Sequence, residues 1–71
     1  MMPAESVIEW MREAYEKKLR LEVRSTGRIE DGHMILSVNS ISGDVGEITI
    51  EEFAKAKGEF LRWKHSREKA A

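Results

Sequence analysis

The chain has 71 residues, 41% of them hydrophobic and 35% charged, with a net charge of −1 and no cysteine. This length predicts a single domain, residues 1–71, whose core is near the lower limit of independent stability, and without cysteine the chain forms neither disulfides nor thiolate metal sites. Its longest apolar runs of about four residues fall far short of the roughly 20 that cross a bilayer, and its start lacks the pattern of a signal peptide, so we expect a cytoplasmic protein that does not bind membranes.

The first predicted element is an amphipathic helix over residues 4–18. Its apolar residues fall on one half of the helical wheel, opposite acidic ones; they are Val7, Ile8, Trp10, Met11, Ala14 and Tyr15. Acidic residues dominate its first turns while Lys17 and Lys18 close it, which suits the helix dipole. The pattern predicts a helix that buries one face.

Residues 19–30 alternate without a break between polar residues and apolar or small ones. The apolar or small positions are Leu19, Leu21, Val23, Ser25, Gly27 and Ile29. Strict alternation is typical of a strand with one buried and one exposed face. We therefore predict a first strand over 19–30 whose apolar side faces the core.

A hairpin turn is predicted at Asp31-Gly32, a dipeptide that adopts the positive φ angles of two-residue hairpin loops. The second strand then covers residues 33–41, antiparallel to the first. Their apolar residues should share one face of the sheet. The expected opposed pairs are Ile29 with Met34, Gly27 with Leu36, and Ser25 with Val38.

The start of the last helix has a clear local signal. Thr49 is followed three residues later by Glu52, as in a capping box, and Ile48 and Phe53 have the spacing of a hydrophobic staple. The helix is predicted over 50–67.

The complete predicted order is a helix, three strands and a helix. The ranges are 4–18 for the first helix, 19–30, 33–41 and 45–48 for the strands, and 50–67 for the last helix. Both helices can cover the apolar side of the sheet. The fold class is therefore α+β, with two layers: a three-stranded antiparallel meander and both helices packed on one face.

The last helix carries two apolar strips. One contains Ile50, Ala54 and Leu61, the other contains Phe53, Ala56, Phe60 and Trp63, and Lys57 and Lys64 lie between them. Either the lysine stems lie along apolar surface with their ammonium groups in water, or one strip faces the sheet and the other a second protein. The second interpretation predicts a homodimer or partner interface anchored by Phe60 and Trp63.

The polar side of the predicted sheet is a second candidate binding surface. Its candidate residues are Arg24, Arg28, Asn39, Ile35 and Ile41. Arginine and asparagine are residues that read base edges, so nucleic acid is one possible partner. Glu22 and Glu30 share this side and would repel phosphate, whereas exposed isoleucines favour a protein partner.

The charge distribution leaves two interpretations open. Residues 1–52 contain eleven acidic and six basic residues, whereas residues 53–71 contain two acidic and six basic ones. A basic end on an acidic body is typical of a protein with an anionic partner. The same placement also suits cations near the C-terminus of a helix.

The element order and length resemble a double-stranded-RNA-binding domain. That family contacts phosphate through a lysine-rich start to its second helix. This chain has Thr49-Ile50-Glu51-Glu52 there, and acidic residues at that position oppose phosphate binding. The resemblance implies the topology and does not imply RNA binding.

No catalytic, cofactor or metal site is predicted. His33 follows Asp31 at a hairpin turn where polar residues are common, and His65 suits the end of a helix. We therefore expect a non-enzymatic protein-interaction module, a regulator, inhibitor or adaptor of the kind that phages or mobile elements encode, that binds a protein partner, forms a homodimer and takes no small-molecule substrate. The alternative is a nucleic-acid-binding domain that uses the polar sheet face and the basic end of the last helix.

Overall fold

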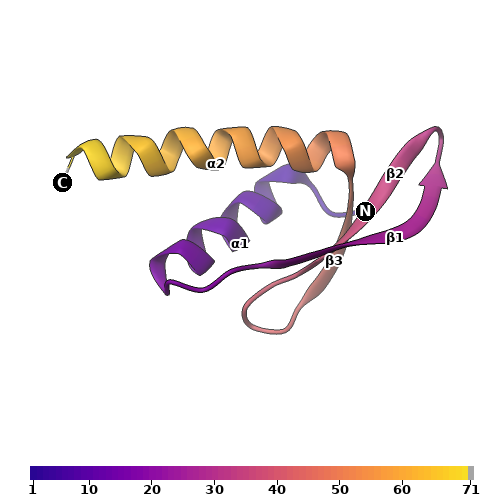
Figure 1. Ribbon diagram of the computed structural model, residues 1–71, viewed down its shortest axis with the longest axis horizontal. Helices are drawn as coiled ribbons and strands as arrows, with labels where there is room; N and C mark the ends of the chain where they lie inside the picture. The colour runs from indigo at the N-terminus through magenta and orange to yellow at the C-terminus, as the bar shows by residue number, and fades with distance from the viewer. Residues whose placement is uncertain (71) are drawn as a thin grey trace.

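The computed structural model describes residues 1–70 and contains two helices and three strands (Figure 1). In chain order they are α1 (Ala4–Glu16), β1 (Glu22–Glu30), β2 (His33–Asn39), β3 (Val45–Thr49) and α2 (Ile50–Ala70). The strands form one antiparallel sheet in the order β1-β2-β3, which confirms the predicted meander. Within residues 1–70, neither helix combines the length and the apolar character needed to span a membrane.

The helix ends follow local chemistry. Pro3, with extended backbone, stands directly before α1. α1 ends at Glu16, two residues earlier than predicted, because Lys18 adopts a left-handed backbone with φ of 57°. At the start of α2, the Glu52 amide donates a hydrogen bond to Thr49 Oγ1 at 3.2 Å. The predicted N-cap is therefore confirmed.

The core lies between the two helices and one side of the sheet. α1 contributes Val7, Ile8 and Met11, the sheet contributes Val38 and Ile48, and α2 contributes Ala56; all six are buried. The small side chain of Ala56 lets α2 approach the sheet closely. Because both helices meet the same side of the sheet, the predicted two-layer α+β arrangement is confirmed.

A bulge in β1 changes the predicted register of the hairpin. Near the turn the pairing is as predicted, with Ile29 opposite Met34. Beyond that pair, three β1 residues, Thr26 to Arg28, stand opposite the single residue Ile35. The rest of the predicted register is therefore wrong by two residues. The observed pairs are Ser25 with Leu36 and Val23 with Val38.

Local hydrogen bonds and one glycine account for this bulge. The Thr26 hydroxyl donates to the Ile35 carbonyl at 2.8 Å and accepts from the Arg28 amide at 3.1 Å. The Gly27 amide donates to Ser25 Oγ at 3.2 Å, and Gly27 itself has φ of 78°, which a glycine adopts without strain. Serine and threonine side chains thus replace the ladder bonds that the extra residues forgo.

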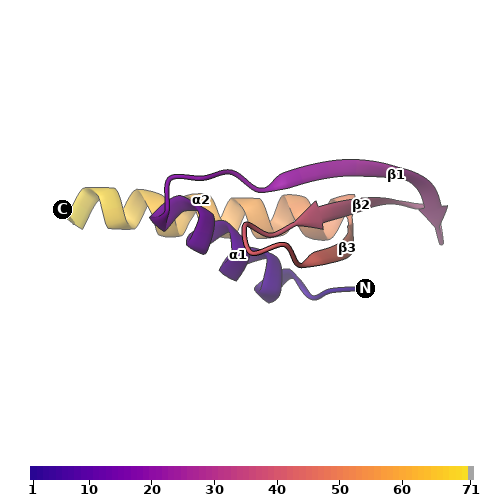
Figure 2. The same cartoon turned by 90° about the horizontal axis from the view of Figure 1, so that it is seen from below.

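β1 lies largely outside the packed part of the molecule. α2 packs against β2 and β3, while β1 runs along the margin of the molecule and its hairpin with β2 projects past the first turn of α2 (Figures 1 and 2). No residue from Glu22 to Glu30 is buried. The prediction that one side of this strand is buried is therefore wrong, because no helix covers it.

Candidate interaction site

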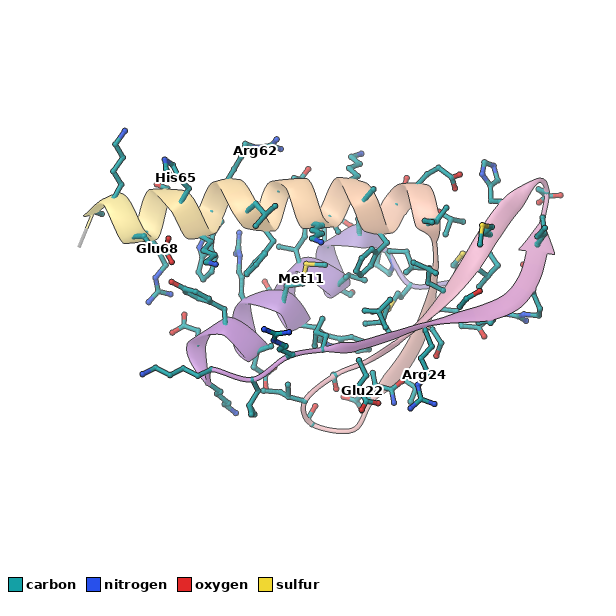
Figure 3. All side chains as sticks on the ribbon, viewed as in Figure 1. Met11, Glu22, Arg24, Arg62, His65 and Glu68 are labelled. Atoms are coloured by element: carbon teal, nitrogen blue, oxygen red, sulfur yellow. The ribbon has the colours of Figure 1, made fainter. Side chains whose placement is uncertain are left out.

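An open groove of about 490 Å³ separates β1 and the segment before it from the helices. One wall consists of Leu19, Arg20, Leu21 and Val23, the other of Phe53, Lys57, Phe60 and Lys64 from α2, and Met11 and Tyr15 from α1 complete the lining. Figure 3 shows Met11 in the space between the two helices. The groove exists because the apolar side of β1 faces toward α2 without touching it closely enough to close the gap.

The groove is basic although the protein is weakly acidic. Arg20, Lys57 and Lys64 line it, and none of its lining residues is acidic. The ammonium group of Lys64 lies 5.4 Å from the centroid of the Tyr15 ring, a cation–π contact that fixes this charge at the groove. Apolar walls with cations and no carboxylate favour an occupant that is both apolar and anionic.

Three aromatic rings join α1 to α2 at one end of the groove. The centroid of the Tyr15 ring lies 6.1 Å from that of Phe60 and 5.8 Å from that of Trp63, both in edge-to-face geometry. Phe60 and Trp63 are themselves 5.8 Å apart. The two residues predicted to anchor a partner interface therefore pack within the chain, and the apolar surface on which the predicted homodimer depended is partly occupied by α1.

Two arginines extend this junction. The guanidinium carbons of Arg12 and Arg67 each lie 5.0 Å from the centroid of the Trp63 ring. Arg67 also forms an ion pair with Glu16, which ties the last turns of both helices together. The Nε atom of Arg12 is buried without a hydrogen-bond partner, and the contact with the Trp63 ring stabilises this guanidinium group.

The hydroxyl of Tyr15 makes this junction sensitive to pH. It donates a hydrogen bond to Glu68 Oε2 at 2.9 Å, and this bond raises the pKa of Tyr15 above its usual 10.0 because the carboxylate stabilises the neutral phenol. The contribution of the bond to stability is therefore present below pH 10 and is lost as the pH rises through the raised pKa.

Glu68→Ala is expected to lower the pKa of Tyr15 toward 10.0. Tyr15 is the only tyrosine, so the ultraviolet absorbance of tyrosinate follows this group alone in a pH titration. Glu59→Ala, which removes another exposed carboxylate of α2, is the control and should leave the midpoint unchanged. Equal midpoints in the wild type and Glu68→Ala would contradict the hydrogen bond.

The arginines of the outer sheet face are paired with carboxylates. Arg24 lies 3.7 Å from Glu22, and Arg28 lies 3.5 Å from Glu30 and also pairs with Glu47. Figure 3 shows Glu22 and Arg24 side by side on the side of the sheet that faces away from the helices. These ion pairs compensate the charges that a nucleic-acid interface would need for phosphate.

Ile35 is fully buried, so the prediction that it is exposed on this face is wrong. The ion pair between Arg28 in β1 and Glu47 in β3 has to cross β2, and Glu47 lies opposite Ser37, which is on the same face as Ile35. The stems of the paired side chains therefore cover Ile35. A partner cannot reach it.

Ile41 and Asn39 lie at the far end of the sheet. β2 ends at Asn39, two residues earlier than predicted, because the next five residues form a loop closed by a hydrogen bond from the Ser40 amide to the Asp44 carbonyl at 2.7 Å. Ile41 is a partly exposed residue of this loop, so the alternation of the strand does not set its direction. The predicted site residues thus occupy three separate places and do not form one surface.

Four exposed apolar side chains in the hairpin and in the segment just before it were not among the predicted site residues. The exposed fractions are 56% for Leu19, 39% for Val23, 68% for Ile29 and 44% for Met34. Their alternation is visible in the sequence, but alternation by itself predicts a buried face. Only the position of α2, which packs over β2 and β3, shows that this face of β1 is exposed and not buried.

The two histidines form no metal site in the described part of the chain. The Nδ1 atom of His33 lies 3.0 Å from Glu51 Oε1, which links the hairpin to the first turn of α2. His65 points outward from α2 (Figure 3). Within residues 1–70 there is no group of three histidine, cysteine or acidic side chains that could hold a metal ion.

Comparisons with known proteins identify no relative. No family model matches the sequence, and no curated protein or solved structure is detectably similar to it. The element order still resembles that of a double-stranded-RNA-binding domain, but Glu51 and Glu52 occupy the first turn of α2. The resemblance therefore remains one of topology, and the surface of the chain itself supplies the evidence about function.

Proposed function

We propose that the protein is a non-enzymatic interaction module, of the regulator, inhibitor or adaptor type expected from the sequence, that binds another polypeptide on the uncovered apolar side of β1. The observation that supports it is the exposure of Val23 and Ile29 in β1 and of Leu19 in the segment just before it. Apolar side chains that lie uncovered along one side of an element are typical of a surface that binds a partner.

The partner is expected to contact the side chains of β1 more than its backbone edge. The edge of β3 is partly covered, because the Met2 amide donates a hydrogen bond to the Glu47 carbonyl at 2.8 Å. The edge of β1 is open, but its bulge and its alternating charges are features that discourage the addition of another strand. A face-on contact with the apolar side of β1 avoids both obstacles.

Val23→Glu is expected to abolish partner binding with little loss of stability. The side chain of Val23 is already partly in water, so a carboxylate there should change the free energy of unfolding by about 0.5 kcal/mol or less. The same carboxylate would have to lose its hydration among the apolar side chains of the interface, which opposes binding. The measurement is affinity capture from the native host with wild-type and Val23→Glu protein, with bound proteins and nucleic acids both identified.

Arg24→Glu is the matched control. It places a carboxylate on the neighbouring residue of the same strand, but on the opposite side of the sheet. A polypeptide that is captured by wild type and Arg24→Glu but lost with Val23→Glu supports the proposal. Capture of nucleic acid that Arg24→Glu abolishes and Val23→Glu leaves intact would replace it with the nucleic-acid-binding alternative.

A further inference from the structure

We propose that the groove beside β1 binds an amphipathic helix of the partner, and that this helix carries acidic residues at heptad spacing. The inference rests on the proposed function, because it names the chemistry of the polypeptide bound there. The evidence for this inference is a repeat on the α2 wall of the groove, in which a phenylalanine is followed four residues later by a lysine. The repeat consists of Phe53 with Lys57 and Phe60 with Lys64.

The spacing of this repeat fits a helix. Phe53 and Phe60 are seven residues apart, as are Lys57 and Lys64, which corresponds to about 10.5 Å along the axis of α2. A helix packed alongside α2 repeats its own side chains at the same interval. A strand would place same-side residues roughly 6.6 Å apart, and residues near 10.5 Å would point to opposite sides.

The charge of the groove selects an acidic partner. Lys57 and Lys64 stand on one wall and Arg20 on the other, with no acidic side chain between them. Among residues 1–70, neither Lys57 nor Arg20 forms an ion pair within the chain. Carboxylates flanking the apolar stripe of the bound helix would meet these cations at the rim, while its apolar residues enter between Phe53 and Val23.

The helices of a second copy do not meet this requirement. α1 is the acidic amphipathic helix of the chain, but its apolar face is already buried, with Val7, Ile8 and Met11 in the core. α2 would bring its own Lys57 and Lys64 against those of the first copy. The occupant is therefore expected to belong to a different protein.

The inference is tested with a labelled three-heptad helical peptide that has leucine at the a and d positions and glutamate at e and g. Its counterpart has lysine in place of every glutamate. Fluorescence anisotropy should show that wild-type protein binds the glutamate peptide about tenfold or more tightly than the lysine peptide, because three rim charges each contribute modestly. The Lys57→Glu/Lys64→Glu variant should invert this preference.

The matched control is Lys55→Glu/Arg62→Glu. These two residues are also seven positions apart on α2 and exposed, and Arg62 points away from α1 and the sheet (Figure 3). This variant changes the net charge by the same amount but should keep the wild-type preference. Circular dichroism on both double variants verifies that the helices are intact, and Lys57→Glu alone, which spares the contact with Tyr15, should weaken the preference in the same direction.

Three results would overturn the inference. Equal effects of the two double variants would mean that overall charge, not the groove, selects the peptide. Binding of laurate in the groove without binding of either peptide would assign it to a small anionic amphiphile. A native partner that is lost with Val23→Glu but fully retained by Lys57→Glu/Lys64→Glu would also reject the acidic helix, and this last result would leave the proposed function standing. Capture of no polypeptide by the wild type would instead reject the proposed function.

Discussion

Ile48→Ala is expected to lower the free energy of unfolding by about 3 kcal/mol, the middle of the range for removing a buried isoleucine side chain. Ile48 is fully buried in the core cluster to which both helices contribute side chains. A domain of this size has a total stability of only about 4–10 kcal/mol. The single change should therefore remove between roughly a third and three quarters of it.

The measurement is urea unfolding followed by far-ultraviolet circular dichroism. An unchanged slope of the transition would verify that unfolding remains two-state. Val45→Ala is the control, because Val45 lies in the same strand with its side chain mostly in water. It should change the free energy of unfolding by about 0.5 kcal/mol or less. Equal losses of stability from the two substitutions would mean that Ile48 is not buried in the core.

The parts of the fold that the sequence predicted correctly are those set by neighbouring residues. The dipeptide Asp31-Gly32 adopts the positive φ angles its chemistry favours, and Thr49 caps α2 through its own hydroxyl. Helical periodicity identified the buried side of α1 because Val7, Ile8 and Met11 lie on one stripe. Each signal acts within a few residues, so no knowledge of the tertiary structure was needed.

The bulge in β1 depended on side-chain bonds that an alternating pattern conceals. Ser25, Thr26 and Gly27 satisfy the description of small and polar positions in a strand, yet the hydroxyls of Ser25 and Thr26 form hydrogen bonds with backbone groups at the bulge. Two extra residues preserve the alternation, because Ser25 and Ile29 still point to the same side. The pattern of apolar residues therefore cannot distinguish the bulged register from the regular one.

The candidate site was harder to predict because it depends on where α2 lies. Of the two strips on α2, the one with Ala56, Phe60 and Trp63 faces the core and α1, whereas Ile50 and Leu61 of the other are exposed. The neighbour predicted for the strip with Phe60 and Trp63 is therefore α1 of the same chain. An uncovered apolar surface lies instead on β1, where the sequence predicted a buried face.

Trp63→Ala is expected to lower the free energy of unfolding by about 2 kcal/mol. It removes the edge-to-face contact with Tyr15 and the ring that the guanidinium groups of Arg12 and Arg67 contact, and these aromatic and cation–π contacts contribute roughly 0.5–1.5 kcal/mol each. Part of this is offset because Trp63 is only half-buried.

Trp63→Phe is the control that separates packing from partner binding. It keeps an aromatic ring between the helices and should restore more than half of the lost stability, measured by urea unfolding with circular dichroism as the probe. If Trp63 acts only through the helix junction, Trp63→Ala protein at a temperature where it stays folded should still capture the partner of the wild type. If Trp63→Ala leaves the stability unchanged but abolishes capture, Trp63 contacts the partner directly. The interaction surface would then lie on the outer side of the α1 and α2 junction, away from β1.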